Sequence, residues 1–137
     1  AAAMMLGAEG VQVGTRFALS CESSAHDDFK TRCLGLPEGD TLLTLKSLSP
    51  TRLVKNDFFY SVDEAQKRGA SADELRVLLG KGRAKKGMFE GDLQAGELEI
   101  GQAASMLSAI QPAGEIVSEL VATCRSLLQK AGEKALF

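Results

Sequence analysis

The stretch GVQVGTRF, residues 10–17, decides the fold that this sequence predicts. Two valines alternate with Gln12 before a glycine ends the run, which is typical of a short strand whose C-terminal end opens into a loop. The run AAAMMLG before it, residues 1–7, predicts the last turns of a helix that Gly7 stops. A helix, a tight turn and a β-branched strand in this order indicate an α/β protein built in layers.

A single strand of this kind needs neighbours on both sides, because its backbone N–H and C=O groups must find hydrogen-bond partners. The later extended pieces of the chain are too short to flank it reliably. The chain also starts at Ala1, inside the first helical run. We therefore expect the partner strands to precede Ala1 and an N-terminal part of the domain to be absent from this sequence.

Most of the remaining chain predicts helices with recognisable start and stop signals. Ser23 or Ser24 can cap a helix over residues 25–34, which Gly35 and Pro37 end. Apolar spacing and a capping box that starts at Ser71 define three more helices. They span residues 57–68, 71–79 and 103–107.

The last and clearest amphipathic helix begins at Pro112, where the missing N–H of proline costs nothing. Its apolar residues recur at steps of one, three or four, which places them on one face. They are Ile116, Val117, Leu120, Val121, Cys124, Leu127, Leu128 and Ala131. We expect this face to cover an apolar surface and Cys124 to be part of a core.

Two segments lack helical periodicity. The pieces 41–48 and 51–56 are short and extended and lie on either side of a Ser-Pro turn, so they are a candidate hairpin. Residues 80–101 contain six of the fourteen glycines, which predicts a loop-rich excursion rather than a packed element.

Composition excludes several classes of protein. A chain of 137 residues predicts one domain, and its net charge of −2 argues against a strongly basic nucleic-acid module or a polybasic membrane anchor. No apolar run approaches the ~20 residues of a membrane span. Three cysteines without a CxxC pair, Cys21, Cys33 and Cys124, are neither a disulfide framework nor a zinc site, so no metal is expected. We interpret them as reduced thiols of a cytoplasmic protein.

The end of the predicted strand is a candidate phosphate site. The backbone N–H groups of Gly14 and Thr15 and the Thr15 hydroxyl are groups that bind phosphate oxygens. In (β/α)8 barrels a phosphate site is often built from the loops after the seventh and eighth strands. The alternative from the residues alone is a glycine that serves only a tight turn.

Other reactive residues favour structural roles. His26 and Cys33 are seven residues apart, about 10 Å along a helix, too far for a nucleophile pair, so His26 is expected to bond near its helix start. The stretch GKGRAKKG, residues 80–87, lacks the Ser or Thr of a P-loop and indicates a solvated basic loop. Attraction for a phosphorylated substrate or cofactor is its alternative reading. The acidic stretch 90–99 lacks the spacing of a calcium loop.

Several segments taken together resemble one family. They are MMLGAEGVQVGTRF (4–17), ESSAH (22–26), RLVKN (52–56), EGDLQAGELEIGQ (90–102) and QPAGEIV (111–117). In this order they resemble the C-terminal part of the nitronate monooxygenase (2-nitropropane dioxygenase-like) family, which includes the FMN-dependent enoyl-acyl-carrier-protein reductases. The resemblance extends over nearly the whole chain.

The resemblance implies an α/β fold that is the C-terminal portion of an FMN-binding (β/α)8 TIM barrel, mostly helical, with one barrel strand and a short hairpin. Residues 1–36 would end the barrel, and residues 37–137 would form a helical extension that packs back on it. By the same resemblance four residues hold the FMN phosphate, and two more belong to a segment near the flavin. The first four are Gln12, Val13, Gly14 and Thr15, and the other two are Gly101 and Gln102.

The family's catalytic histidine would lie upstream of Ala1, and His26 does not match it. The resemblance therefore implies an enzyme as the parent chain and an inactive 137-residue piece. The activity would be oxidation of alkyl nitronates, or alternatively NAD(P)H-dependent reduction of an enoyl thioester. The expected partners are a small-molecule substrate and FMN. Neither nucleic acid nor a membrane is expected as a partner, and a homodimer is one possible assembly.

A hypothesis of a different class is a small helical binding or scaffold module that folds alone. Its interface would be the apolar face of the C-terminal helix. Cooperative unfolding of the chain without a flavin requirement would favour this module over an FMN oxidoreductase.

Overall fold

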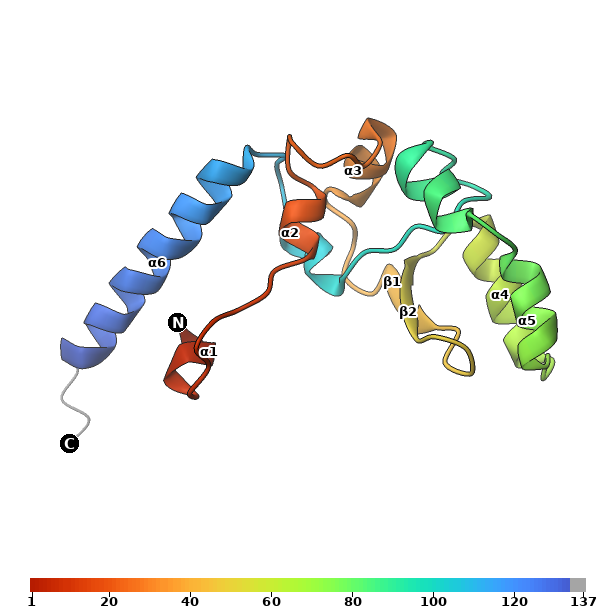
Figure 1. Cartoon of the computed structure of the whole chain (residues 1–137), viewed down its shortest axis with the longest axis horizontal. Helices are drawn as coiled ribbons and strands as arrows, with labels where there is room; N and C mark the ends of the chain where they lie inside the picture. The colour runs from red at the N-terminus through yellow and green to blue at the C-terminus, as the bar shows by residue number, and fades with distance from the viewer. Residues whose placement is uncertain (134–137) are drawn as a thin grey trace.

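The computed structural model describes residues 1–133, which form an arch. Helix α6 and the N-terminal helix lie at one end, and α4 and α5 lie at the other (Figure 1). The elements in chain order are α1 (Ala2–Met5), α2 (Thr15–Ala18), α3 (Asp27–Cys33), β1 (Thr41–Thr44), β2 (Thr51–Val54), α4 (Asp57–Lys67), α5 (Ala72–Leu79), the π-helix η1 (Lys85–Phe89), the 3₁₀ helix η2 (Gln102–Met106) and α6 (Ala113–Glu133). Among these residues no helix combines the length and apolar character needed to cross a bilayer.

The strand predicted at Val11–Val13 is not formed. The segment is irregular and its first valine is 67% exposed. A strand is defined by hydrogen bonds to a neighbouring strand, and within residues 1–133 none lies beside this segment. The preceding helical run is confirmed: α1 ends at Met5, Leu6 is its C-cap residue, and Gly7 follows with φ +95°, the left-handed conformation that favours glycine.

The candidate hairpin is confirmed. β1 and β2 pair antiparallel, with Thr41 opposite Val54 and Thr44 opposite Thr51. A later segment adds to the free edge of β2: the Val54 N–H donates to the Leu98 carbonyl at 2.9 Å. Leu53 and Glu99 form an antiparallel bridge. The backbone that leads to Gly101 is therefore hydrogen-bonded to the hairpin.

The glycine-rich stretch 80–101, predicted to be an unpacked loop, contributes to the core instead. Leu98 and Ile100 are buried, and Gly87 and Gly96 lie where two backbone segments cross. A Cβ on Gly87 would lie 2.5 Å from the carbonyl oxygen of Glu97. The glycines are needed here because the chains touch, which local sequence does not reveal.

Two apolar clusters fill the interior, one on each side of the hairpin. The first joins α3 to the segment around Leu98 and Ile100, with Phe29 and Cys33 fully buried. The second packs β2 against α4 through Leu53, Phe58, Phe59, Val62 and Leu45. The first cluster contains residues from both sides of residue 36. The division of the chain into a barrel end (1–36) and a helical extension (37–137) stays a prediction, and residues 134–137 of the extension lie outside the described residues.

One predicted helix start is confirmed: Ser71 forms the capping box with Glu74 at the start of α5. The start of α4 uses a cap that was not predicted, because the Asn56 side chain accepts from the Phe59 N–H. The predicted cap of α3 was wrong: His26, not Ser23 or Ser24, precedes this helix, and its Nδ1 accepts the Asp28 N–H at 3.2 Å.

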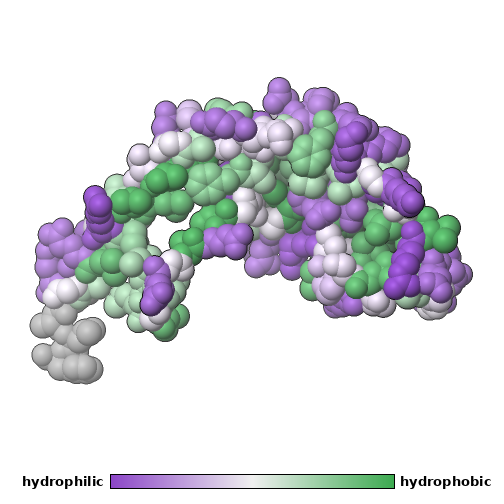
Figure 2. All heavy atoms as spheres, viewed as in Figure 1, coloured by the Kyte–Doolittle hydropathy of each residue, from purple (hydrophilic) through white to green (hydrophobic). Residues whose placement is uncertain are grey.

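The apolar face of α6 is mostly exposed. Ile116 is its only buried residue within residues 113–133, so the expected cover is not supplied by the described chain. The prediction that Cys124 is core was wrong: it is half-buried, and its Sγ lies 3.7 Å from the Met4 sulfur. Figure 2 shows apolar side chains along this helix beside an opening towards the segment that joins α1 to α2.

The start of α6 is held to the rest of the chain by polar contacts. A Glu22 carboxylate oxygen accepts the Ala113 N–H at 2.8 Å, which caps the helix and places a negative charge at its positive end. Arg16 donates to Gln111 and lies 3.5 Å from a Glu119 carboxylate oxygen. Pro112 directly precedes the helix, one residue from its predicted place.

The backbone crossing gives a stability test. We expect Gly96→Ala to destabilise the protein by roughly 1–3 kcal/mol, because the new Cβ would overlap the Gly87 Cα and the Asp92 carbonyl. Gly114→Ala is the matched control, because its Cβ would meet nothing within 4 Å. Thermal unfolding of the two variants measures the difference. Equal melting temperatures would contradict the close crossing.

Candidate functional site

The predicted phosphate loop ends at the start of a short helix. Gly14 is the N-cap residue of α2, and its carbonyl accepts the N–H groups of Phe17 and Ala18. The first N–H groups of a helix have no partner inside it. Gly14 has φ −95°, and a Cβ added there would meet nothing within 4 Å. The backbone of Gly14 and Thr15 therefore faces open space that a ligand could occupy.

The structure joins this loop to the second predicted segment. The Gly101 N–H donates to the Thr15 hydroxyl oxygen at 3.2 Å, although 86 residues separate them. Gly14, Thr15 and Gly101 line one cavity of about 500 Å³, together with residues 49–52 of the hairpin and residues 99–100. Three of the six predicted site residues thus meet at one place.

The remaining three predicted residues do not line this cavity. Gln12 is exposed and Val13 half-buried on the segment before Gly14. Gln102 is exposed and lines a neighbouring cavity of about 740 Å³, which lies between the loop 36–39 and η2. Arg52 lines both cavities, and its Nη1 donates to the Thr41 carbonyl at 2.8 Å. The guanidinium is thus held in place at their common wall.

Charges on the cavity wall are mixed. Arg52 is the cation and Glu99 the carboxylate among the residues that line the 500 Å³ cavity. Glu99 is followed by Ile100, whose N–H donates to the Arg52 carbonyl at 3.3 Å. The wall near Gly101 is therefore built from the edge of the hairpin rather than from a mobile loop.

Two buried polar residues that the sequence did not single out hold the frame together. The Asn56 amide donates to the carbonyls of Leu93 at 2.9 Å and Gly96 at 2.8 Å while its oxygen caps α4. Lys30 is 4% exposed, and its Nζ donates to the Ser23 carbonyl at 2.8 Å. Asn56 stands directly before a helix of clear periodicity, so the sequence did contain a signal for a helix cap. No local pattern in the sequence indicates that Lys30 is buried.

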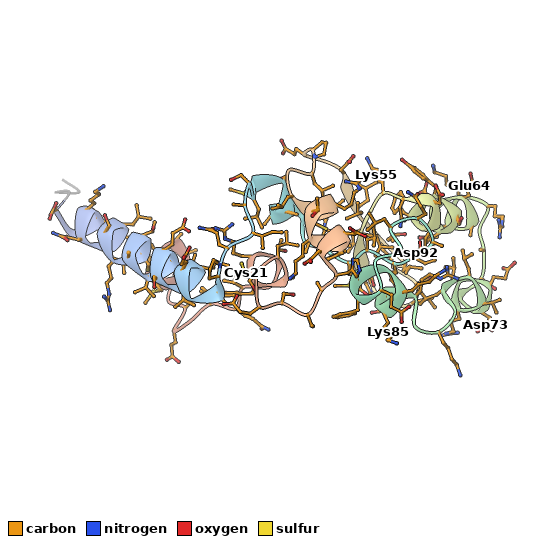
Figure 3. All side chains as sticks on the ribbon, turned by 90° about the horizontal axis from the view of Figure 1, so that it is seen from above. Cys21, Lys55, Glu64, Asp73, Lys85 and Asp92 are labelled. Atoms are coloured by element: carbon orange, nitrogen blue, oxygen red, sulfur yellow. The ribbon has the colours of Figure 1, made fainter. Side chains whose placement is uncertain are left out.

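The structural interpretation of His26 is confirmed. Its ring caps α3 and packs on Gly91, where a Cβ would lie 2.6 Å from Nδ1. Cys33 is fully buried, and burial raises the pKa of its thiol to about 12. A thiol with this pKa is not a nucleophile near neutral pH. Cys21 lies elsewhere, close to the start of α6 (Figure 3).

The prediction of a solvated basic loop over residues 80–87 is confirmed only in part: Lys81, Lys85 and Lys86 are exposed, but Arg83 is half-buried and η1 begins at Lys85. Two of these cations pair with the acidic segment that follows. The Lys85 Nζ lies 2.9 Å from Glu90, and the Lys86 Nζ lies 2.9 Å from Asp92. The Lys86 bond and the N–H groups of residues 94–95 lower the pKa of Asp92 to about 2. Lys85 and Asp92 lie at the end of the molecule that carries α4 and α5, whereas Cys21 lies towards α6 (Figure 3).

Glu97 lies on the segment that leads to Gly101, and the pKa of its carboxyl group is strongly raised. This residue is 6% exposed. The pKa of this carboxyl is raised to about 7, chiefly by burial and then by the negative charge of Glu99, while Arg83 partly opposes the rise. Glu97 begins the segment that pairs with β2 and ends at Gly101. Its ionisation therefore affects the stability of the frame behind the cavity.

The arrangement of elements is similar to that of solved FabK chains from Thermotoga maritima. One superposes with a TM-score of 0.85 at 29% identity and covers 96% of this chain and 42% of its own. A point mutant of the same protein gives a TM-score of 0.78 at 30% identity, with 96% of this chain and 39% of the mutant chain covered.

The nitronate monooxygenase family model matches residues 1–123, so the chain belongs to that family. A probable nitronate monooxygenase of Staphylococcus saprophyticus is 41% identical over 64 residues, which are 46% of this chain. The chain covers 18% of that relative and about two fifths of the FabK chains. The family resemblance of the sequence motifs is thereby confirmed.

The raised pKa of Glu97 predicts a pH-dependent stability. The folded state holds its proton up to a pKa of about 7, whereas the ordinary value is 4.5. Its contribution is therefore most favourable below pH 4.5, and stability falls as the pH rises towards 7, by on the order of 3 kcal/mol in total. Glu97→Gln removes the charge, so we expect it to raise the unfolding free energy at pH 8 far more than at pH 5.

Urea unfolding of the variant and of the unsubstituted protein at both pH values measures this difference. Glu90→Gln is the control, because that carboxylate is exposed and on the surface. A stabilisation by Glu97→Gln that is the same at pH 5 and pH 8 would show that the buried carboxyl is not the titrating group.

Proposed function

We propose that this chain is the C-terminal portion of an FMN-dependent oxidoreductase of the nitronate monooxygenase type. The observation that carries the proposal is the meeting of Thr15 with Gly101, which joins two family motifs at one cavity. The family model and the likeness to FabK support it. We further propose that the parent fold is a (β/α)8 barrel, in which residues 11–13 pair with strands of the remaining protein.

The residues fit a flavin phosphate at the start of α2. The N–H groups of Gly14 and Thr15 and the Thr15 hydroxyl are hydrogen-bond donors, and the missing side chain of Gly14 leaves open space beside them. Gln12 and Val13 would align the loop, and Gly101 and Gln102 would bound it from the hairpin side. Bound FMN would supply the redox chemistry, while these residues bind and orient it.

The substrate of the oxidoreductase has two candidates. Oxidation of an alkyl nitronate to a carbonyl compound and nitrite is supported by the name of the family and by that of the Staphylococcus relative. Reduction of an enoyl-acyl-carrier-protein thioester by NAD(P)H is favoured by the structural likeness to FabK, which extends over 96% of this chain. We place nitronate oxidation first, because both the family model and the sequence relative carry that name.

Two assays on the protein that carries this chain separate the candidates. Nitrite release from an alkyl nitronate in the presence of oxygen supports the first. NAD(P)H consumption that depends on an enoyl thioester supports the second. A protein that is purified without a visible flavin spectrum and takes up no FMN would contradict both and would return the small helical module as the better hypothesis.

Gly14 provides the direct test of the phosphate loop. We expect Gly14→Val to weaken FMN binding by about tenfold or more, because its side chain would block close approach of a phosphate to the backbone N–H groups. The fold should tolerate the change, since φ is −95° and a Cβ meets nothing within 4 Å.

Flavin fluorescence quenching on titration of the flavin-free protein measures the affinity. Gly114→Val serves as the control, because this glycine is exposed on α6, away from the cavity. FMN affinity in the Gly14→Val protein equal to that of the parent would remove the phosphate assignment.

A further inference from the structure

Within residues 1–133 the Thr15 hydroxyl accepts a hydrogen bond but donates none. A threonine hydroxyl carries one proton and two acceptor lone pairs. One lone pair accepts the Gly101 N–H at 3.2 Å. Across residues 1–133 the hydroxyl proton finds no acceptor. Because Thr15 is half-buried at an open cavity, this proton is free to donate to water or to the oxygen of a ligand.

The Gly101 contact restricts where this proton can point. Because the N–H of Gly101 takes one side of the oxygen, the proton must turn to another. Thr15, Gly14 and Gly101 together line the cavity of about 500 Å³. A side chain at position 101 would destroy the arrangement, since its Cβ would overlap the Thr15 hydroxyl oxygen.

Gly101 is itself held rigidly. The residue before it, Ile100, is 6% exposed and donates its N–H to the Arg52 carbonyl. Glu99 forms a bridge with Leu53 of β2. The hairpin therefore determines where the Gly101 N–H lies, and through it the direction of the Thr15 hydroxyl.

We propose that Gly101 is a positioning residue: its N–H holds the Thr15 hydroxyl so that the hydroxyl proton is directed to the phosphate monoester of the flavin. This inference rests on the proposed FMN site. Recognition of the phosphate would then depend on Gly101, which follows the segment paired with the hairpin and acts through its backbone N–H on Thr15.

The consequence is a selective effect on the phosphate. Riboflavin has the same ring system as FMN but carries no phosphate, so the proposed hydrogen bond contributes to FMN binding alone. A hydrogen bond to a charged group contributes enough to change affinity by roughly 10- to 100-fold. We therefore expect Gly101→Ala and Thr15→Val to weaken FMN binding by about that factor while riboflavin binding changes less than about threefold.

The experiment titrates the flavin-free protein that carries this chain with FMN and, separately, with riboflavin. Thr15→Ser keeps a hydroxyl and should retain the preference for FMN, which Thr15→Val loses. In the double variant Gly101→Ala with Thr15→Val, FMN binding should be no weaker than with Thr15→Val alone, because both changes remove the same hydrogen bond. Gly114→Ala is the control for the glycine substitution.

Equal weakening of FMN and riboflavin binding would overturn the proposal, because it would show a merely structural role for position 101. So would a Thr15→Val protein that keeps its full preference for FMN, a result that stands even if Gly101→Ala fails to fold. In both cases a parent protein that prefers FMN would leave the proposed function intact. A parent protein that binds neither flavin would overturn both.

Discussion

The hydrogen bond from the Gly101 N–H to the Thr15 hydroxyl connects the start of α2 to the segment that pairs with the hairpin. On one side, Thr15 begins the helix that follows the glycine of the predicted phosphate loop. On the other, Gly101 ends a segment that pairs with the edge of the hairpin. Both residues line one cavity, and a side chain at position 101 would overlap the threonine hydroxyl.

The rigidity behind that contact comes from close backbone packing and one amide. Gly87 and Gly96 allow two segments to touch, and Asn56 satisfies two carbonyl groups of the turn between them while it caps α4. A buried amide that makes all these bonds is an expensive group to leave unpaired. Glu97 begins the segment that pairs with β2, and burial raises the pKa of its carboxyl to about 7.

Much of the apolar surface lies outside the two clusters. Val117, Leu120 and Leu127 are each about half exposed on α6, and the segment after Gly10 forms no sheet within residues 1–133. Rows of exposed apolar side chains are typical of surfaces that other protein covers. Together with coverage of about two fifths of the FabK chains, this supports the proposal of a barrel portion, in which that cover comes from the rest of the parent protein.

The sequence by itself determined the elements whose signals are local: the hairpin around Pro50, the capping box at Ser71, the glycine stop after α1 and the periodic helix that ends the chain. It also predicted the family, because motif order is a property of sequence. Only the tertiary structure decided that the glycine-rich stretch 80–101 is core and that residues 11–13 form no strand here. It also decided which of the candidate site residues meet. Those outcomes depend on contacts between residues far apart in the chain, and neither periodicity nor turn chemistry records such contacts.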